Sequence, residues 1–386
     1  MTFFSIYYVT SNQKIITKLL NSLFQFWFKK RNFFMTSIIV TVGPKSINPK
    51  TLKNLIEAGA ESFRINLSHS NKKNLHEYFE ILNSVGINPA IDTQGPQLRV
   101  CNTNLSRDIS PGQKIKLLFN KEKSFDEKGL YILLNHPEAI EQISKGDVIK
   151  VDFEGLAIEI IKRDTNTSYE AVVVSSGPIL INRAVDINNK SLELSTLTEF
   201  DKYAIDFAIS RGTKEVYASF ISSASQVKFL KDLLGNDVSL ISKIETALGV
   251  SNVNEIIELS DKILLDRGDL SREITIPSVP IAVFNILKLA KNKSDVLIAT
   301  NVLDSMMQSN LPSRAEISDI FNHLAAGASG IVLAAEVAIG NNPVSSTAFL
   351  KYLIKLFHNY ENGFHGIGRI DKPPRHLIGE ELYNWL

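Results

Sequence analysis

The chain alternates short apolar runs of strand length with longer segments that have a helical period. The strand candidates are Ile38–Val42, Ser62–Ile65, Pro89–Ile91, Val216–Phe220, Ser239–Ile244, Lys262–Leu265, Val296–Ala299 and Gly330–Ala334. Strict alternation of strands and helices predicts a parallel sheet, because parallel neighbours need a crossover connection. Eight repeats favour a sheet that closes into a (β/α)8 TIM barrel, a fold of about 250 residues. We therefore expect residues 36–96 and 186–360 to form such a barrel.

A long interruption separates the third and fourth strand candidates. Residues 97–185 contain turn-then-strand units at 111–116 and 145–150, and runs rich in β-branched residues at Leu156–Ile161 and Tyr169–Val174. This pattern predicts an all-β insertion, called the β module below. Loops that follow barrel strands leave from the face that carries barrel active sites. The β module is therefore expected to act as a lid.

The two ends of the chain differ from the rest. Residues 1–35 contain no Asp or Glu, and polar residues at 11–14 interrupt their apolar runs, so no 18-residue stretch qualifies as a transmembrane segment. This N-terminal extension is interpreted as a targeting segment, a membrane-surface helix or a start assigned too early, with Met35 as a natural start. The early start or a dispensable extension is favoured. Residues 361–386 are expected to be a C-terminal tail that packs through Tyr383 and Trp385.

The charge balance and the cysteine content restrict which partners and which cellular compartment are expected. The chain has 42 Lys and Arg against 41 Asp and Glu, which gives no basic excess for a nucleic-acid partner. Its one cysteine, Cys101, cannot form an internal disulfide. This favours a reducing compartment. The expected location is cytoplasmic, with an organelle as the alternative if residues 1–34 are a transit peptide.

Polar side chains gather at the C-terminal ends of six strand candidates. Lys243 and Glu245 are two residues apart on a strand, so both point to the same side. Asp269 follows Gly268 directly after the next strand. Two carboxylates and an ammonium at the mouth of a barrel can hold a divalent cation and an anionic substrate together. The other polar ends are Thr41–Pro44, Arg64–His69, Asp92–Arg99 and Ala299–Asn301. A salt bridge or loop cap would explain any one of them, but six together predict a site.

Residues 37–360 resemble the pyruvate kinase family, in order and nearly throughout. The matching motifs are Thr41–Ser46, Phe63–His69, Asp92–Pro96, Ala218–Ile221, Ile241–Glu245, Arg267–Leu270, Ile298–Thr300 and Ser313–Asp319. The family also carries a β insertion, its B domain, after the third strand. The resemblance implies transfer of phosphate from phosphoenolpyruvate to ADP, which gives pyruvate and ATP in the last step of glycolysis.

The resemblance also implies roles for individual residues at the barrel mouth. Lys243 would stabilise the phosphoryl group and the developing enolate. Arg64 would contact the transferring phosphate, and Thr300 would lie beside the enolate. Glu245 and Asp269 would bind Mg²⁺ or Mn²⁺. The substrate carboxylate would be bound by the amides of Gly268 and Asp269, where a helix begins.

A second group of residues matches the family's sites for a monovalent cation and a nucleotide. The K⁺ ligands would be Asn66, Ser68, Asp92 and Thr93. ADP or ATP would be bound by Asn66, His69 and Arg99. Gln97 stands where cation-dependent members carry Glu, and Gln94 where the family usually has Lys. K⁺ is therefore expected as a cofactor, while Gln97 leaves a strict requirement open.

Other departures from the family keep two further interpretations open. Asp266 replaces a small residue before Arg-Gly-Asp, Ser271 replaces a glycine, and most of the family's C-terminal regulatory domain has no counterpart. One alternative is a Mg²⁺-dependent enzyme of the citrate-lyase or aldolase type, because Ile244–Val250 also resembles those barrels. The other is a non-catalytic descendant that acts as a binding partner. A homo-oligomer is compatible with either.

Overall fold

The structure is a computed structural model. It describes residues 36–105, 109–119, 129–151, 156–181, 183–188, 190, 192, 194–361 and 371–386. The chain divides into two units, Met1–Thr36 and Ser37–Leu386, and the fold below belongs to the second. The three interpretations of residues 1–35 lie outside the described residues.

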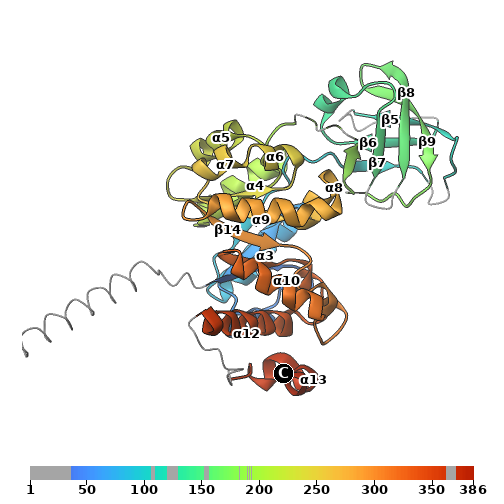
Figure 1. Cartoon of the computed structure of the whole chain (residues 1–386). Coiled ribbons are helices and arrows are strands. Elements are labelled where there is room, and N and C mark those ends of the chain that lie inside the picture. Colours follow the sequence, from blue (N-terminus) through green and yellow to red (C-terminus); the bar gives the residue numbers. More distant parts are fainter. Residues whose placement is uncertain are drawn as a thin grey trace, which may run out of the picture. The chain divides into compact units, whose positions relative to one another are not determined.

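Eight parallel strands form a closed barrel (Figure 1). In their order around the barrel they are β1 (Ser37–Val42), β2 (Ser62–Asn66), β3 (Ala90–Asp92), β11 (Glu215–Ala218), β12 (Ser239–Ile244), β13 (Lys262–Asp266), β14 (Asp295–Ala299) and β15 (Gly330–Leu333). Closure is made by β1, which pairs in parallel with both β15 and β2. The predicted (β/α)8 barrel is confirmed. Because all eight strands run parallel, their C-terminal ends meet at one mouth.

Helices and short 3₁₀ turns connect the barrel strands. They are α2 (Pro49–Ala58), η1 (Leu67–His69), α3 (Lys72–Ser84), α4 (Glu199–Ser210), α5 (Ala224–Leu234), α6 (Ala247–Ser251), α7 (Val253–Leu259), α8 (Arg267–Glu273), η3 (Ile276–Ser278), α9 (Val279–Ala290), η4 (Asp304–Met307), α10 (Arg314–Ala325), α11 (Ala335–Ala338) and α12 (Pro343–Glu361). Local sequence fixes several helix starts. In α4, Thr198 and Asp201 each accept a hydrogen bond from the other's backbone amide, and Ser313 and Glu316 do the same in α10.

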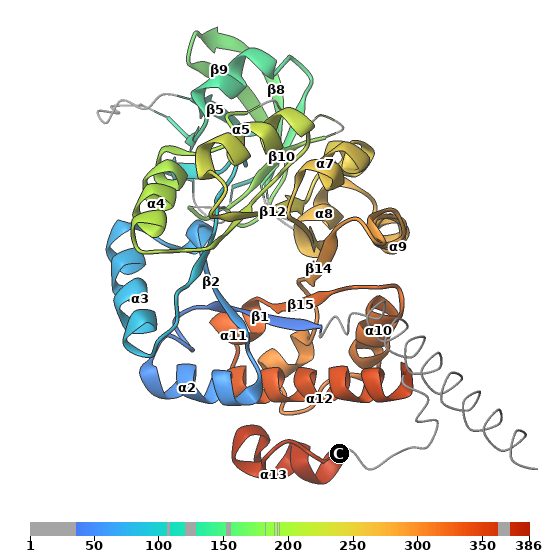
Figure 2. The same ribbon diagram turned by 90° about the vertical axis from the view of Figure 1, so that its left-hand side faces the viewer.

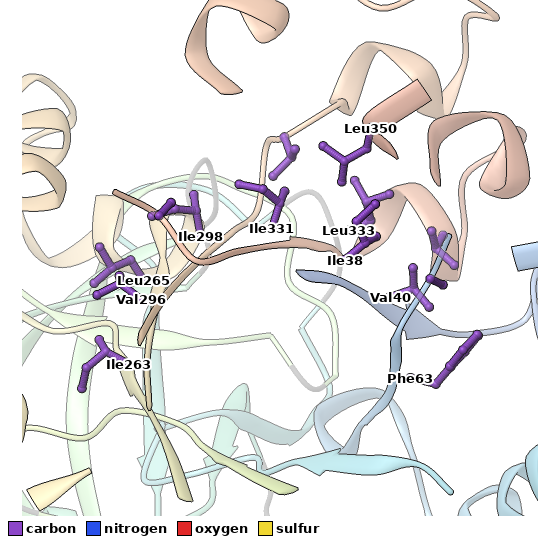
Figure 3. Packing of buried hydrophobic residues seen from close by; sticks show 14 of the residues in the cluster. Ile38, Val40, Phe63, Ile263, Leu265, Val296, Ile298, Ile331, Leu333 and Leu350 are labelled. Carbon is purple, nitrogen blue, oxygen red and sulfur yellow. The ribbon is translucent and has the colours of Figure 1, made fainter. Parts of the chain in front are cut away.

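Alternate residues of the strands face two different apolar cores. Ile38 and Val40 of β1 belong to the core that lies between strands and helices (Figure 3). Ile39 belongs to a smaller cluster that fills the barrel interior. The other members of this interior cluster are Ala90, Tyr217, Ile241, Leu264, Leu297, Ala299 and Val332. This division follows from the period of two in a strand, and it gives the mouth an apolar floor.

The β module follows β3 and precedes α4 in the chain, and it forms a second sheet (Figure 2). Its strands in spatial order are β10 (Val185–Ile187), β7 (Val148–Val151), β8 (Ala157–Thr165), β9 (Ser168–Ser175), β5 (Lys114–Leu118), β6 (Tyr131–Leu134) and β4 (Val100–Thr103), with η2 (Pro137–Gln142) between β6 and β7. All pairs are antiparallel except β5 with β6. The sheet has its own core, built around residues such as Leu117, Ile158 and Ala171. The predicted insertion is confirmed as a fold element, while its boundaries at 97 and 185 stay predictions.

The C-terminal segment contains a helix that the sequence did not predict. Helix α13 (Arg375–Trp385) packs on α12 and buries Leu377, Ile378 and Leu382. Trp385 lies with its ring 6.2 Å from that of Phe349, yet it is 45% exposed. The aliphatic residues therefore supply most of the buried contact. In the described part of the chain, every helix lacks the combination of length and apolar character that crossing a bilayer requires.

Candidate active site

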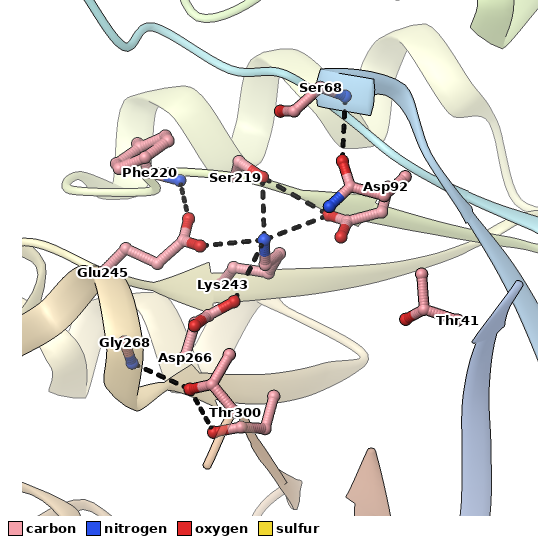
Figure 4. Close-up of polar contacts among 12 residues, drawn as sticks. Thr41, Ser68, Asp92, Ser219, Phe220, Lys243, Glu245, Asp266, Gly268 and Thr300 are labelled. Carbon is pink, nitrogen blue, oxygen red and sulfur yellow. Dashed lines mark hydrogen bonds and ion pairs between the residues drawn. The ribbon is translucent and has the colours of Figure 1, made fainter. Parts of the chain in front are cut away.

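Lys243 lies at the centre of the charged groups at the barrel mouth (Figure 4). Its ammonium is 2.8 Å from Glu245 Oε1, 3.1 Å from Asp92 Oδ1 and 3.5 Å from Asp266 Oδ2. It also donates a hydrogen bond to Ser219 Oγ at 3.0 Å. Burial lowers the pKa of Lys243, but the three carboxylates outweigh it and the net effect raises that pKa. The raised pKa favours the charged ammonium, and its contact with Glu245, which directly follows β12, shows that the two side chains point to the same side.

Arg64 is held rigidly beside Lys243 by partners from three strands. Its Nη1 is 3.1 Å from Asp92 Oδ2, and its Nε and Nη2 donate to Thr41 Oγ1 at 3.1 and 2.9 Å. The guanidinium carbon lies 5.1 Å from the centre of the Tyr217 ring. Arg64 is only 2% exposed. Asp92 thus binds two cationic side chains at once, and it fixes the distance between them.

Three carboxylates form an acidic cluster at the ends of β12 and β13. One oxygen each from Glu245, Asp266 and Asp269 lies within 4.8 Å of the others. Burial raises the pKa of Glu245 to about 8 and that of Asp269 to about 6, against Lys243, and the neighbouring carboxylates add to both shifts. Glu245 is oriented by the amide of Phe220, which donates to its Oε2 at 2.6 Å. Hard oxygen donors that repel one another in a buried site suit a divalent cation.

Thr300 is positioned by the start of α8. The Gly268 amide donates to Thr300 Oγ1 at 2.8 Å, and this hydroxyl donates to the carbonyl of Ala299 at 2.6 Å. Arg267 Nη2 donates to the carbonyls of Thr300 and Asn301 at 2.6 and 3.0 Å, where both residues have a positive φ. The Gly268 amide, expected to bind the substrate carboxylate, is therefore bonded to Thr300 here.

Arg267 is itself fixed by α10. Its Nη1 donates to Asp319 Oδ2 and lies 2.8 Å from His323 Nε2. Burial raises the pKa of Asp319, but the hydrogen bond from His323 and the charge of Arg267 prevail and hold it at about 2. The Ser313–Asp319 motif consequently has a supporting role: Ser313 and Glu316 cap α10, while Asp319 holds the arginine that shapes the Thr300 loop.

The expected K⁺ ligands gather at the ends of β2 and β3, and each already has protein partners. Asn66 Oδ1 accepts from the Ser68 amide at 2.8 Å, and Thr93 Oγ1 accepts from the Ser219 amide at 3.0 Å. Ser68 Oγ accepts from Arg99 at 3.4 Å, and Asp92 is ion-paired as described. Oxygen donors of the right kind are present, but the charge of Asp92 is balanced by protein cations.

The residues expected to bind the nucleotide form a basic group next to the acidic cluster. Burial and the charges of Arg99 and Arg183 lower the pKa of His69. Burial lowers the pKa of Arg99 as well, while Asp269 and Glu245 are close enough to oppose the shift. Strand β10 of the second sheet is also tied to α8, because Arg272 Nη2 donates to Asp186 Oδ2 at 2.6 Å.

Three residues of the site have no role in the sequence-based prediction. Ser219 accepts from Lys243 and donates to the Thr93 carbonyl at 2.7 Å. Tyr217 lies under Arg64, and Asp266 completes the acidic cluster. Ser219 stands in the Ala-Ser-Phe-Ile motif, and Asp266 is itself a departure from the family, so both carried a signal. Gln94 has a supporting contact, since its amide nitrogen donates to the Leu67 carbonyl at 3.2 Å.

Fold and site together define a (β/α)8-barrel protein with an acidic cluster beside two buried cations at its mouth. A family model described as the pyruvate kinase barrel domain matches residues 33–347. The chain belongs to the pyruvate kinase family.

Individual relatives agree with this assignment. The pyruvate kinase of Lachancea kluyveri is 32% identical over 334 residues, which cover 83% of this chain and 66% of that protein. Pyruvate kinase 1 of Saccharomyces cerevisiae is 32% identical over 327 residues, which cover 81% of this chain and 65% of that protein. The pyruvate kinase of Sporosarcina psychrophila is 32% identical over 324 residues, which cover 81% of this chain and 55% of that protein. The chain thus spans less than two thirds of the length of each of these relatives.

Proposed function

We propose that this chain transfers the phosphoryl group of phosphoenolpyruvate to ADP, giving pyruvate and ATP, with a divalent cation held by Glu245 and Asp269. The observation that carries the proposal is the convergence of Arg64 and Lys243 beside that carboxylate pair. Phosphoryl transfer needs charge neutralisation and alignment more than covalent help from the protein. Two anionic substrates meet here, so fixed cations at one mouth are the groups that the reaction requires.

Each residue contributes a separate part of this chemistry. Arg64 would bind the transferring phosphoryl group, because Asp92 and Thr41 hold its guanidinium in one orientation. Lys243 would face the bridging oxygen, where negative charge grows as the phosphoryl group leaves, so its contribution is largest in the transition state. Thr300 would lie at the enolate carbon with its hydroxyl already oriented. Mg²⁺ or Mn²⁺, when bound, would supply the remaining charge neutralisation.

His69 and Arg99 would receive the nucleotide phosphates, together with Asn66. Support comes from the charges of Arg99 and Arg183, which lower the pKa of His69, and from the nearness of Asp269 and Glu245 to Arg99. K⁺ would be bound by Asn66, Ser68, Asp92 and Thr93. Gln97 is neutral and buried at the position of the family's glutamate, so we expect K⁺ to assist and not to be indispensable.

The citrate-lyase alternative accounts for less of the site. It requires the carboxylates of the acidic cluster, but not the pair formed by Arg64 and Asp92 or the β module. A non-catalytic descendant would not need Arg64 and Lys243 fixed next to an acidic cluster. Both observations favour the kinase. Cytoplasmic location and assembly into a homo-oligomer remain predictions, to be checked by fractionation and by light scattering of the purified chain.

A lactate-dehydrogenase-coupled assay tests the proposal. Purified protein with Mg²⁺ should oxidise NADH only when both phosphoenolpyruvate and ADP are present, and Arg64→Ala should abolish this signal. Turnover that is absent with Mg²⁺ or Mn²⁺, with and without K⁺, in a folded protein would contradict the proposal. Release of pyruvate from phosphoenolpyruvate without ADP would indicate hydrolysis, whereas pyruvate formed by carbon–carbon cleavage of an added hydroxy acid would favour a lyase.

A further inference from the structure

We infer that Asp266 is a third carboxylate ligand of the divalent cation, so that this chain binds the cation before any phosphorylated substrate arrives. The inference rests on the proposed function, which places a cation on Glu245 and Asp269. Asp266 is the last residue of β13 and directly precedes α8.

A structural role as a helix cap does not explain Asp266. It occupies the N-cap position of α8, where an aspartate usually accepts a hydrogen bond from an amide two or three residues later. Its side chain makes no such bond. The residue is 5% exposed, and its Oδ1 is buried without a hydrogen-bond partner. Burying an unsatisfied carboxylate oxygen is costly, so a ligand at this oxygen would account for its position.

The geometry of the cluster matches one shared ion. Oxygens of Glu245, Asp266 and Asp269 all lie within 4.8 Å of each other. Two oxygens on opposite sides of a single ion are about 4.2 Å apart for Mg²⁺ and about 5 Å apart for Ca²⁺, from their usual bond lengths. Small side-chain rotations would therefore place all three carboxylates on the same cation.

The third carboxylate changes the charge of the site. Lys243 pairs with Glu245 and Asp266 of this cluster and also with Asp92, while the charges of Arg272 and Arg99 act on Asp269. Asp266 adds one carboxylate to the two expected metal ligands, and Lys243 is shared between this cluster and Asp92. Mg²⁺ is usually bound by one or two carboxylates plus substrate phosphates, and the affinity of oxygen sites rises with the number of ligand charges. Asp266 should therefore make binding independent of substrate.

Titration with Mn²⁺ in the absence of phosphoenolpyruvate and ADP tests this inference. Free Mn²⁺ is followed by electron paramagnetic resonance in the wild type, Asp266→Ala and Asp266→Asn. We expect the Kd for Mn²⁺ to rise at least tenfold in Asp266→Ala and less in Asp266→Asn, which keeps an oxygen donor. Glu258→Gln is the matched control, because Glu258 is an exposed carboxylate paired with Lys293 in the helix before β13. Its Kd should be that of the wild type.

Melting temperatures provide a second measurement that does not depend on activity. Removal of Asp266 relieves repulsion in the empty cluster, so Asp266→Ala should melt at or above the wild type without metal. The increase in melting temperature on addition of Mn²⁺ should be larger in the wild type than in Asp266→Ala, because a ligand stabilises the state that binds it. Equal Kd values for the wild type and Asp266→Ala would overturn the inference, as would a wild type that binds Mn²⁺ only with phosphoenolpyruvate. If Asp266 controls Mn²⁺ affinity but turnover is absent, the inference holds and the proposed function fails.

Discussion

The amide of Gly268 donates a hydrogen bond of 2.8 Å to the hydroxyl of Thr300, which joins the start of α8 to the loop after β14. The same hydroxyl donates to the Ala299 carbonyl, so its two contacts fix its direction. With its proton donated to Ala299 and one lone pair bonded to Gly268, the hydroxyl keeps its second lone pair to accept a hydrogen bond. The bond therefore connects the helix that carries Asp269 with the residue expected beside the enolate.

Replacement of Thr300 should separate this positioning from simple packing. We expect Thr300→Ser to retain most activity, because the hydroxyl and its bond from Gly268 remain. Thr300→Val keeps the volume and loses the hydroxyl, and kcat should fall about 10²-fold, the lower range for lost proton-transfer assistance. Steady-state kinetics on both variants measure this. Equal kcat values for Thr300→Ser and Thr300→Val would show that the Thr300 hydroxyl has no chemical role.

Lys243→Met should abolish turnover while metal binding persists. Loss of one preorganised charge at the transition state typically costs about 10²–10³ in rate. Lys243 is also buried among carboxylates, so its removal should cost about 3–5 kcal/mol of stability, which saturating Mg²⁺ should partly restore. Turnover and melting temperature are measured together at high Mg²⁺. A well-folded Lys243→Met protein with wild-type kcat would reject the catalytic assignment.

Glu245→Gln should act on the cation and leave the backbone contact intact. An amide oxygen can still accept from Phe220, but the ligand loses its charge. We expect the Mg²⁺ concentration for half-maximal rate to rise at least tenfold. Calorimetric titration of Mg²⁺ against the wild type and Glu258→Gln, as before, provides the comparison. An unchanged Mg²⁺ requirement would place the cation elsewhere.

The raised pKa values of Glu245 and Asp269 predict how pH affects the metal-free protein. Their folded-state pKa values, about 8 and about 6, exceed the ordinary value of about 4 for carboxyl groups. Between pH 4 and 8 the folded state therefore binds more protons than the unfolded state, and these groups make stability fall as pH rises. In EDTA, the melting temperature of the wild type should fall between pH 5 and pH 8, and it should fall by more than that of Glu245→Gln. A pH-independent difference would refute this, and Mg²⁺ should abolish the trend.

K⁺ should increase the rate without being required. Arg64 and Lys243 already balance the charge of Asp92, and Gln97 adds no charge to be compensated. We expect turnover to fall less than about tenfold when K⁺ is replaced by tetramethylammonium, as removal of one weakly coupled charge implies. Gln97→Glu should strengthen the K⁺ dependence. Complete loss of turnover without K⁺ in the wild type would contradict this prediction.

The barrel could be predicted because its signals are local and repeated. Each strand is an apolar run that ends in polar residues, and the period of two alone placed Lys243 and Glu245 on one side. Strands β4, β6 and β10 are only three or four residues long, too short for any periodicity to appear. Helix α13 was missed because its apolar residues gain their stability by packing on α12 and not from a strong helical pattern.

Contacts between distant parts of the chain explain what sequence reasoning missed in the site. Asp92 was predicted as a K⁺ ligand, but its pairing with Arg64 and Lys243 depends on how β2, β3 and β12 are arranged. Ser219 lies in a quoted motif, yet its contact with Lys243 spans 24 residues. The sequence identified Asp266 as a departure from the family. That its side chain makes no capping hydrogen bond at the start of α8 depends on the folded structure.

The apolar floor beneath the mouth makes the charged residues interdependent. Ile39, Leu264 and Leu297 exclude water from below, so each charge acts strongly on every other and mutational effects should not add. Loss of Lys243 should be tolerated better in a chain that has already lost Asp266 than in one that keeps it. The order of substitutions should therefore matter, because Asp266 is expected to be tolerated only in a chain whose ammonium or bound cation offsets its charge.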